Sequence, residues 1–355
     1  MKKKIGVVFG GKSDEYEVSL TSAANVLKAL DADKYDVVQI GITREGKWYI
    51  TEASIEDIKN GAWVTAAGNK EYTLSADPSK KEFDCIIPVL HGDHGEDGEI
   101  QGLFQMAEIP YVGSGVKASA NCMDKTAAKQ LAKLTGVRMA EHYVVRISGF
   151  VKNPDAEVKK AMETLHGEFP MFVKPSSAGS SVGVSKVNSE SELGDAIAEA
   201  LKYDHKALVE ECIIGRELEV AVLGNLEPEA SSVGEIKSAA EFYDYESKYI
   251  NPEIQTSIVE DLPQAVIDEI RNYACNLYKT LDCRGLARVD FFYADTEKDG
   301  KRIVFNEINT LPGFTNISMY PMLWKHDGLD TPELMDKLIE LALDEHRDWV
   351  KTLAF

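Results

Sequence analysis

The sequence has no apolar run long enough to span a bilayer among its 355 residues. Its basic start, Met1–Lys4, has the charge of a signal peptide, but the apolar stretch after it stops at Gly10-Gly11. That stretch is too short for the apolar part of a signal sequence. We therefore expect these residues to form the first core strand of a cytoplasmic protein with no membrane segment.

Positive charge is also scarce. Lys and Arg number 39 and Asp and Glu number 59, which gives a formal net charge of −20. General binding to nucleic acid needs Lys and Arg to displace counterions, so this balance argues against a nucleic-acid partner. A phosphate ligand is not excluded, because a few placed cations and a metal ion can dominate the field locally.

Cysteine pairs and the common nucleotide-binding motifs are absent as well. The five cysteines form no Cys-x-x-Cys pair and four of them lie in apolar segments, which is typical of reduced, buried thiols. There is no GxxxxGK[ST] motif, and no GxGxxG motif follows a strand. A site for ATP would therefore have to be built in another way.

The first third of the chain alternates apolar strands with a helical pattern. A helical spacing of apolar residues runs from Leu20 to Leu30, and strands are expected at 5–9, 35–42 and 83–90. This alternation predicts a parallel sheet with helices on its faces, a Rossmann-like α/β domain. Ligands gather at the carboxyl ends of such strands, where Gly10-Gly11 and His91-Gly92 lie.

The rest of the chain is expected to form two α+β units, so that the domains are 1–122, 123–206 and 207–355. A helix at 124–134 would connect the first two, and about 231–257 lacks periodicity and is expected to be a long mobile loop. The patterns also predict strands at 143–147, 169–174, 183–187, 207–212, 217–223, 286–293 and 302–308, and helices at 156–165, about 190–201, 262–281 and from 331.

The most informative pattern joins Arg288-Val289-Asp290 with Glu307-Ile308-Asn309. Residues two apart on a strand face the same side, so pairing of the two strands would bring three oxygen ligands together beside a guanidinium. Such hard ligands suit Mg²⁺ that carries nucleotide phosphates. The alternative is a solvated sheet face with a cross-strand ion pair, although the strongly apolar flanks of both segments argue against it.

A lysine and a loop of small residues form the second pattern. Lys174 ends an apolar strand, and Pro175–Gly183 follows with small side chains that let backbone amides approach a phosphate. The alternative is a β-hairpin with a flexible tip. Gly179–Gly183 also fits GxSxG with Ser181 as a nucleophile, but that motif needs a helix after the turn and a β-like segment follows here. A serine hydrolase is therefore a rival reading.

Acidic residues follow an apolar strand in the third pattern. Glu210-Glu211, and then Gly215-Arg216-Glu217, could accept hydrogen bonds from an adenine amino group or from ribose hydroxyls. The alternative is a charged strand end, and this interpretation would be favoured if the other motifs were absent.

Two glycine-rich loops lie at strand ends of the first domain. His91–Gly98 precedes a helix, whose amino end suits a carboxylate, and we favour a substrate-facing loop over a metal site at His91 and His94. Glu15, beside Gly10-Gly11, could hold a substrate ammonium group. A helix-initiating acidic residue is the alternative for Glu15.

Taken together and in order, these motifs resemble the D-alanine–D-alanine ligase family, a branch of the ATP-grasp enzymes. The resemblance covers nearly the whole chain and rests on Gly-Gly-Lys-Ser…Glu-Val-Ser, His-Gly…Gly-Glu-Asp-Gly, Met-Asp-Lys, Lys-Pro…Gly-Ser-Ser-Val-Gly, Tyr-Asp-Tyr-Glu-Ser-Lys-Tyr, Arg-Val-Asp and Asn-Glu-Ile-Asn-Thr-Leu-Pro-Gly-Phe-Thr. It implies an ATP-grasp fold behind the N-terminal parallel α/β domain.

The resemblance also implies residue roles for ATP and metal. Two Mg²⁺ (or Mn²⁺) ions would be held by Asp290, Glu307 and Asn309. ATP would be bound by Lys125, Lys174, Ser181, Glu210, Glu211, Gly215, Glu217 and Lys248.

Further roles concern the amino-acid substrates. Glu15 would hold the first ammonium group, with Ser180 and Tyr249 linked to it by hydrogen bonds and Tyr249 on the mobile loop. Arg288 and the amide of Gly313 would stabilise a tetrahedral oxyanion. His91 and Ser318 would contact substrate, with Ser318 at the second substrate's carboxylate.

The implied function is ATP-dependent ligation of two D-alanine molecules through D-alanyl phosphate, for peptidoglycan precursor synthesis, by a homodimer. Tyr249 after Lys248 favours an amine as the second nucleophile over D-lactate, but this pair does not exclude D-serine. A D-alanine–D-serine ligase, another ATP-grasp carboxylate–amine ligase and a non-catalytic nucleotide-binding module remain as alternatives.

Overall fold

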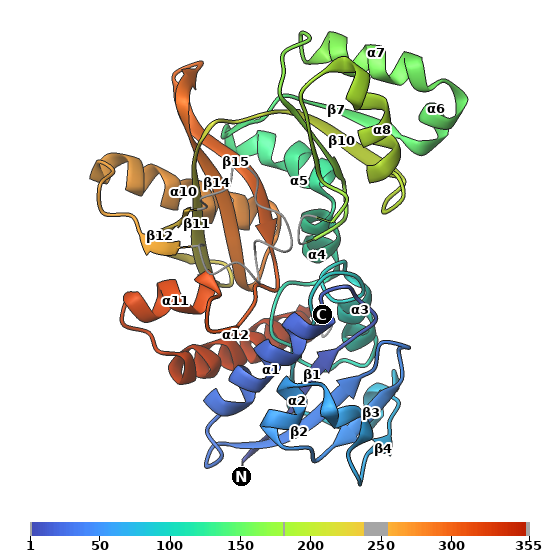
Figure 1. Cartoon of the computed structure of the whole chain (residues 1–355). Coiled ribbons are helices and arrows are strands. Elements are labelled where there is room, and N and C mark those ends of the chain that lie inside the picture. The colour runs from blue at the N-terminus through green and yellow to red at the C-terminus, as the bar shows by residue number, and fades with distance from the viewer. Residues whose placement is uncertain (1, 180–181, 238–254, 353–355) are drawn as a thin grey trace.

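The computed structural model describes residues 2–179, 182–237 and 255–352, and within them the strands form three sheets. The N-terminal sheet lies at the bottom of Figure 1, the sheet that contains β7 and β10 at the upper right, and the sheet that contains β11, β14 and β15 at the left. Among the described residues no helix has both the length and the apolar character needed to cross a membrane.

The N-terminal sheet has the order β4-β3-β2-β1-β5. Strand β1 runs parallel to β2 and to β5, as the alternating pattern predicted, and β3 and β4 add antiparallel strands at one edge. The strands are β1 Lys3–Gly10, β2 Tyr35–Ile42, β3 Trp48–Thr51, β4 Lys70–Glu71 and β5 Cys85–Val89; the helices are α1 Tyr16–Ala29, α2 Ile55–Lys59 and α3 Glu99–Met106, with 3₁₀ turns η1 Ala62–Thr65 and η2 Pro78–Lys80.

The central sheet has the antiparallel order β7-β10-β8-β9. Its core, which includes Val145, Val173, Ile197 and Val209, is packed under α7 and α8. Strand β10 extends this unit past the boundary predicted at residue 206. The elements are β7 His142–Arg146, β8 Met171–Pro175, β9 Ser185–Val187 and β10 Lys206–Glu211, with α6 Ile147–Lys152, α7 Pro154–Thr164 and α8 Glu190–Ala200.

The C-terminal sheet has the order β13-β12-β11-β14-β15-β6, and β14 and β15 are antiparallel neighbours as predicted. Its strands are β6 Arg138–Met139, β11 Gly215–Gly224, β12 Glu229–Lys237, β13 Gln255–Ile258, β14 Gly285–Lys298 and β15 Lys301–Asn309. Its helices are α4 Val116–Met123, α5 Lys125–Ala132, α10 Gln264–Thr280, α11 Met319–His326 and α12 Thr331–Thr352, with a 3₁₀ turn η3 Lys133–Thr135.

The long loop predicted at about 231–257 is shorter than expected at both ends. Strand β12 continues to Lys237 and β13 begins at Gln255, because the two strands pair with each other from Gly234 to Lys237. The residues between them lie outside the described part of the chain.

Helix α12 ties the N-terminal domain to the C-terminal sheet. It packs against α1 and β5 of the N-terminal domain and also against β14 of the C-terminal sheet. Asp336 on this helix accepts a hydrogen bond of 2.7 Å from the Tyr35 hydroxyl and one of 2.5 Å from Lys34. These two hydrogen bonds join α12 to the amino end of β2.

Candidate active site

The antiparallel register of β14 and β15 brings the predicted metal ligands together. Asp290 pairs with Glu307, and Arg288 pairs with Asn309. The buried Asp290 accepts two hydrogen bonds from the Arg288 guanidinium, of 2.8 and 2.7 Å. Burial opposes the charge of Arg288, but Asp290 and Glu219 keep the pKa of Arg288 well above its usual value. The oxygens of Asp290, Glu307 and Asn309 thus form a donor set that fits Mg²⁺.

A buried carboxylate holds two lysines beside this strand pair. Glu210 on β10 is 2.5 Å from the Lys174 Nζ and 2.7 Å from the Lys129 Nζ. Burial alone would raise the pKa of Glu210, but the two lysines lower it to about 2, so the carboxylate is ionised. Lys125 reaches Glu307 at 3.3 Å, which joins the lysines to the acidic strands. This arrangement concentrates three positive charges where the phosphates of a nucleotide could lie.

The small-residue loop after β8 is tied to the start of α5. Lys125 Nζ donates to the carbonyl of Ala178 at 2.8 Å, and the Asp124 side chain caps α5 while it accepts from the Ser176 hydroxyl at 2.6 Å. The next described strand after the loop is β9, which pairs with β8. In the described residues that follow the loop, no helix begins before β9, whereas a GxSxG nucleophile needs a helix directly after the turn. Ser180 and Ser181 themselves lie outside the described residues.

Glu15 lies where the N-terminal domain meets this loop. A Cβ built on Gly92 would be 2.8 Å from Glu15 Oε2, and one built on Gly179 would be 2.7 Å from the same oxygen. The Glu15 carboxylate therefore lies against the backbone of both glycine-rich loops. Close by, the buried Glu96 accepts a hydrogen bond from the Gly92 N–H at 2.9 Å, and burial, with Glu15 nearby, raises the pKa of Glu96 to about 8.

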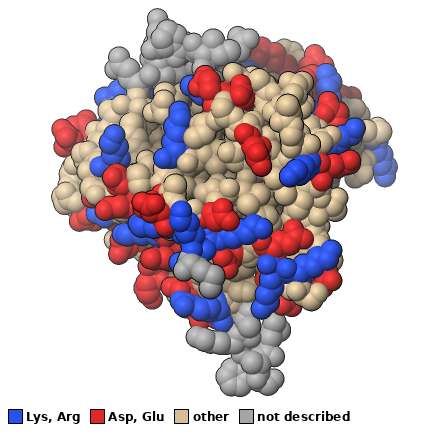
Figure 2. All heavy atoms as spheres, turned by 90° about the horizontal axis from the view of Figure 1, so that it is seen from below, with Lys and Arg blue, Asp and Glu red and all other residues tan. Residues whose placement is uncertain are grey.

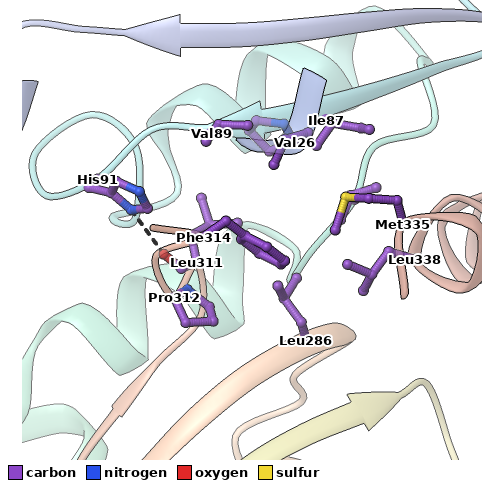
Figure 3. A pocket seen from close by; sticks show the side chains of 12 residues that line it. Val26, Ile87, Val89, His91, Leu286, Leu311, Pro312, Phe314, Met335 and Leu338 are labelled. Atoms are coloured by element: carbon purple, nitrogen blue, oxygen red, sulfur yellow. Dashed lines mark hydrogen bonds between the residues drawn. The ribbon is translucent and has the colours of Figure 1, made fainter. Parts of the chain in front are cut away.

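His91 is turned toward the C-terminal sheet and not toward His94. Its Nδ1 is 3.1 Å from the carbonyl oxygen of Leu311 (Figure 3). Its Nε2 is 3.2 Å from Ser22 Oγ. Apolar side chains around it line a cavity of about 20 Å³, room for about one water. His94 instead contacts Glu99, so the two histidines do not form a shared metal site.

Gly313 and Ser318 are neighbours in the segment between β15 and α11. A Cβ built on Gly313 would lie 2.8 Å from Ser318 Oγ, and that oxygen accepts a hydrogen bond of 3.0 Å from the Thr315 N–H. The predicted oxyanion donor and the predicted carboxylate partner of the second substrate therefore occupy one tight turn.

The other predicted nucleotide ligands lie at the ends of β10 and β11. Glu211 accepts a hydrogen bond of 2.8 Å from the Glu141 N–H, and Gly215 begins β11 opposite Ala294. Glu217 pairs with Phe292 and with Ile236 on either side. Lys248 and Tyr249 lie outside the described residues.

Sequence reasoning missed Lys129 and Ser22. Lys129 follows Lys125 by one helical turn and is only 1% exposed, so its spacing was the available signal. Ser22 lies on the apolar face of α1, where nothing in the sequence marks its hydroxyl as a partner of His91.

Comparisons with known proteins agree with this architecture. The chain matches the family model described as D-ala D-ala ligase N-terminus at residues 4–114 and the one described as D-ala D-ala ligase C-terminus at residues 131–340. It is 46% identical to a D-alanine--D-alanine ligase of Acetivibrio thermocellus, with 99% of this chain and 98% of the relative covered. It is 45% identical to that of Clostridium acetobutylicum, with 96% and 98% covered.

Two solved structures share the fold. The D-alanine-D-alanine ligase from Coxiella burnetii has a TM-score of 0.86 at 36% identity, with 99% of this chain and 97% of that chain covered. The VanG D-Ala:D-Ser ligase from Enterococcus faecalis has a TM-score of 0.85 at 39% identity, with 96% and 100% covered. The expected ATP-grasp fold is confirmed, and the chain belongs to the D-alanine–D-alanine ligase family.

Proposed function

We propose that this protein joins two D-alanine molecules into D-alanyl-D-alanine with the conversion of ATP to ADP and phosphate, for peptidoglycan precursor synthesis. The observation that carries the proposal is the convergence of Asp290, Glu307 and Asn309 beside the lysines that surround Glu210, in a chain of this family. The names of relatives over nearly the full chain support the choice of substrates.

The first step transfers a phosphoryl group. The carboxylate of the first D-alanine attacks the γ-phosphoryl of ATP, which gives D-alanyl phosphate and ADP. Lys125 and Lys174 offset charge on the phosphoryl oxygens, and Asp290, Glu307 and Asn309 would hold two Mg²⁺ or Mn²⁺ ions that neutralise the triphosphate. Glu15 holds the ammonium group of this substrate, assisted by Ser180 and Tyr249.

The second step forms the amide bond. The free amine of the second D-alanine attacks the acyl-phosphate carbonyl, phosphate leaves with the C–O bonding electrons, and the amine loses a proton. Arg288 and the Gly313 N–H stabilise the oxyanion that develops on the carbonyl oxygen. Ser318 binds the carboxylate of the second D-alanine. Lys248 and Tyr249 belong to the loop that we propose to exclude water from the acyl phosphate.

The ATP site is proposed to extend to the ends of β10 and β11. Glu217, Glu211 and Gly215 would surround the adenosine, with Ser181 at the phosphates. Glu210 would contact adenosine and also hold Lys174, an interaction that its carboxylate already makes at 2.5 Å.

ADP release with defined amino acids tests the proposed function. We expect ADP release with D-alanine and none with L-alanine, and D-alanyl-D-alanine as the product by mass spectrometry. D-Alanine with D-serine or D-lactate in competition identifies the second substrate. D-Alanyl-D-serine as the main product would replace the proposal by the activity named for one solved relative, and nucleotide binding without ADP release would favour a binding module.

A matched pair of variants tests the metal ligands. Glu307→Gln keeps the shape of the side chain but removes its charge, so we expect ADP release to fall about 10²-fold or more, as for loss of one charge-stabilising group. Glu297→Gln, at the exposed end of β14, is the control and should keep the wild-type rate. Equal rates for the two variants would contradict the proposed site.

We also propose a homodimer in the cytoplasm, which the family resemblance supports. Light scattering after size-exclusion chromatography should give twice the 39.2 kDa chain mass, and a mass of one chain would reject the dimer.

A further inference from the structure

The hydroxyl of Ser22 links the N-terminal domain to the turn after β15. Ser22 is fully buried on α1. Its Oγ accepts a hydrogen bond of 3.1 Å from the Phe314 N–H and lies 3.2 Å from His91 Nε2. His91 Nδ1 in turn lies 3.1 Å from the Leu311 carbonyl oxygen, the contact drawn in Figure 3.

The acceptors fix the direction of each hydrogen bond in the series that runs from Leu311 through His91 and Ser22 to Phe314. A carbonyl oxygen can only accept, so His91 must carry its proton on Nδ1 and donate to Leu311. Burial lowers the pKa of His91, which keeps the ring neutral and leaves Nε2 as an acceptor. The Ser22 O–H then donates to Nε2, and its oxygen lone pair receives the Phe314 N–H. One buried hydroxyl thereby satisfies groups on two domains.

The two backbone groups at the ends of this series of hydrogen bonds lie on either side of Gly313. Leu311 O lies two residues before Gly313 and the Phe314 N–H lies directly after it. A Cβ built on Gly313 would be 3.8 Å from Ser22 Oγ. Asn25, one turn further along α1, donates to the Phe314 carbonyl at 2.8 Å. Among the described residues the Gly313 N–H donates to no acceptor.

We propose that Ser22 is a positioning residue whose hydroxyl, through Phe314 and His91, holds the Gly313 N–H in the direction of the developing oxyanion. This role rests on the proposed function, in which Gly313 acts in the amide-forming step. A donor stabilises an oxyanion only when it is aimed at the position that the charged oxygen will occupy. A turn held on both sides of Gly313 supplies that aim without any contact between Ser22 and the substrate.

The two chemical steps separate this role from a structural one. Phosphoryl transfer takes place at Lys125 and Lys174, which do not contact Ser22 or Phe314 in the described structure. Ser22→Ala should therefore leave ADP formation within about 3-fold of the wild-type rate. It should slow dipeptide formation about 10- to 100-fold, because a misplaced group costs up to about 10²-fold. The effect should fall on kcat and not on the KM for D-alanine.

Rapid chemical quench of the full-length protein, with ADP and dipeptide measured in the same samples, tests the proposal. Ser22→Thr keeps the hydroxyl and should recover most of the dipeptide rate. Ser119→Ala is the control. It removes another fully buried hydroxyl, which donates to the carbonyl oxygen of Ser114, and it should leave both rates unchanged. Thermal stabilisation by ATP would confirm that the Ser22→Ala variant keeps its nucleotide site.

Three results would overturn the role of Ser22: an unchanged dipeptide rate in Ser22→Ala, an equal loss of both steps, or a Ser22→Thr variant as slow as Ser22→Ala. Each of them leaves the proposed function standing, because the wild type still makes the dipeptide. A wild-type protein that makes no D-alanyl-D-alanine would instead overturn the proposed function, and the role of Ser22 with it.

Discussion

At the scale of single residues, the positive charges of the site depend on one buried carboxylate. Glu210 pairs with Lys129 and Lys174 at once, and all three side chains are largely removed from water. A charge buried in this way is tolerated only when its partners are present, since desolvation of an unpaired ion costs several kcal/mol. The pairing is non-local, which is why the sequence indicated Lys174, whereas Lys129 was marked only by its spacing of one helical turn from Lys125.

Lys129→Met tests whether the stability of the fold depends on the pairing of Lys129 with Glu210. Removal of the ammonium group leaves Glu210 with one partner in a buried position, so we expect the free energy of unfolding to fall by about 3–5 kcal/mol. Urea denaturation followed by circular dichroism measures the change. Lys159→Met removes an exposed lysine that lies 3.7 Å from Glu163 and should change the free energy of unfolding by less than about 1 kcal/mol. A loss of the same size in both variants would contradict the argument.

Glu96 gives the protein a pH-dependent stability of predictable sign. Burial, and then Glu15, raise its folded-state pKa from 4.5 to about 8. Below pH 4.5 both the folded and the unfolded state hold the proton. Between pH 4.5 and 8 only the folded state holds it, so stability decreases as the pH rises, by up to about 1.4 kcal/mol per pH unit.

Glu96→Gln removes this titration. We expect the variant to match the wild type within about 1 kcal/mol at pH 5 and to exceed its free energy of unfolding by about 2 kcal/mol or more at pH 7.5, measured by urea denaturation. Glu190→Gln, an exposed carboxylate on α8, should follow the wild-type profile at both values. Parallel profiles for the wild type and Glu96→Gln would refute the assignment.

At the scale of elements, the alternation of side chains along each strand predicts which residues share a face. The register between β14 and β15 then determines which residues of the two strands lie opposite each other. Alternation alone predicted that Asp290 shares a face with Arg288, and that Glu307 shares one with Asn309. It could not predict that Asp290 would pair with Glu307, because a register depends on the partner strand. The register also shifts after Asp290, a break in the pairing that no sequence pattern indicated.

The close approach of β11 and β14 makes Gly215 a test of the nucleotide end of the sheet. A Cβ there would lie 2.3 Å from the Tyr293 oxygen and 2.7 Å from the Ala294 Cα, both backbone atoms that cannot move without separating the strands. Gly215→Ala should therefore lower the free energy of unfolding by about 1–3 kcal/mol. It should also raise the KM for ATP several-fold, because Glu217 follows two residues later.

The same substitution in helix α8 should have the opposite sign. A Cβ on Gly194 would lie 3.8 Å from Val158 Cγ2, an ordinary contact, and alanine is favoured over glycine inside a helix by about 0.5–1 kcal/mol. Gly194→Ala should thus be slightly more stable than the wild type in urea, with an unchanged KM for ATP. If both Gly215→Ala and Gly194→Ala were destabilised, the distance from the added Cβ to its neighbours would not determine the change in the free energy of unfolding.

At the scale of the whole molecule, the site is assembled from three units that the sequence only partly delimited. The parallel N-terminal sheet followed from its alternating pattern. The boundary between the central and C-terminal units could not be predicted in this way. Strand β10 pairs with β7 and β8, although its neighbour in sequence, β11, pairs with β14. On the face shown in Figure 2, basic side chains lie among acidic ones.

Mg²⁺ should stabilise this assembly only when a nucleotide is bound as well. Asp290 accepts hydrogen bonds from Arg288, and Glu307 pairs with Lys125, so both carboxylates already have cationic partners from the protein. A nucleotide would recruit Lys125 and Lys174 and leave the carboxylates to bind Mg²⁺ from the C-terminal sheet. Because Lys174 lies on the central sheet and Asp290 on the C-terminal one, a ligand bound by both sides ties the two units together.

We therefore expect Mg²⁺ alone to leave its site largely unfilled and to add less than about 0.5 kcal/mol to the free energy of unfolding, the linkage value for a ligand at or below its Kd. Mg²⁺ with a non-hydrolysable ATP analogue at 100 times its Kd should add about 2.7 kcal/mol. Thermal unfolding with each ligand alone, with both, and with both plus EDTA measures the coupling. The Asp290→Asn variant should lose the part that depends on Mg²⁺ and keep the part that depends on the nucleotide alone. Full stabilisation by Mg²⁺ without nucleotide would mean that Arg288 and Lys125 do not compete with the metal for these carboxylates.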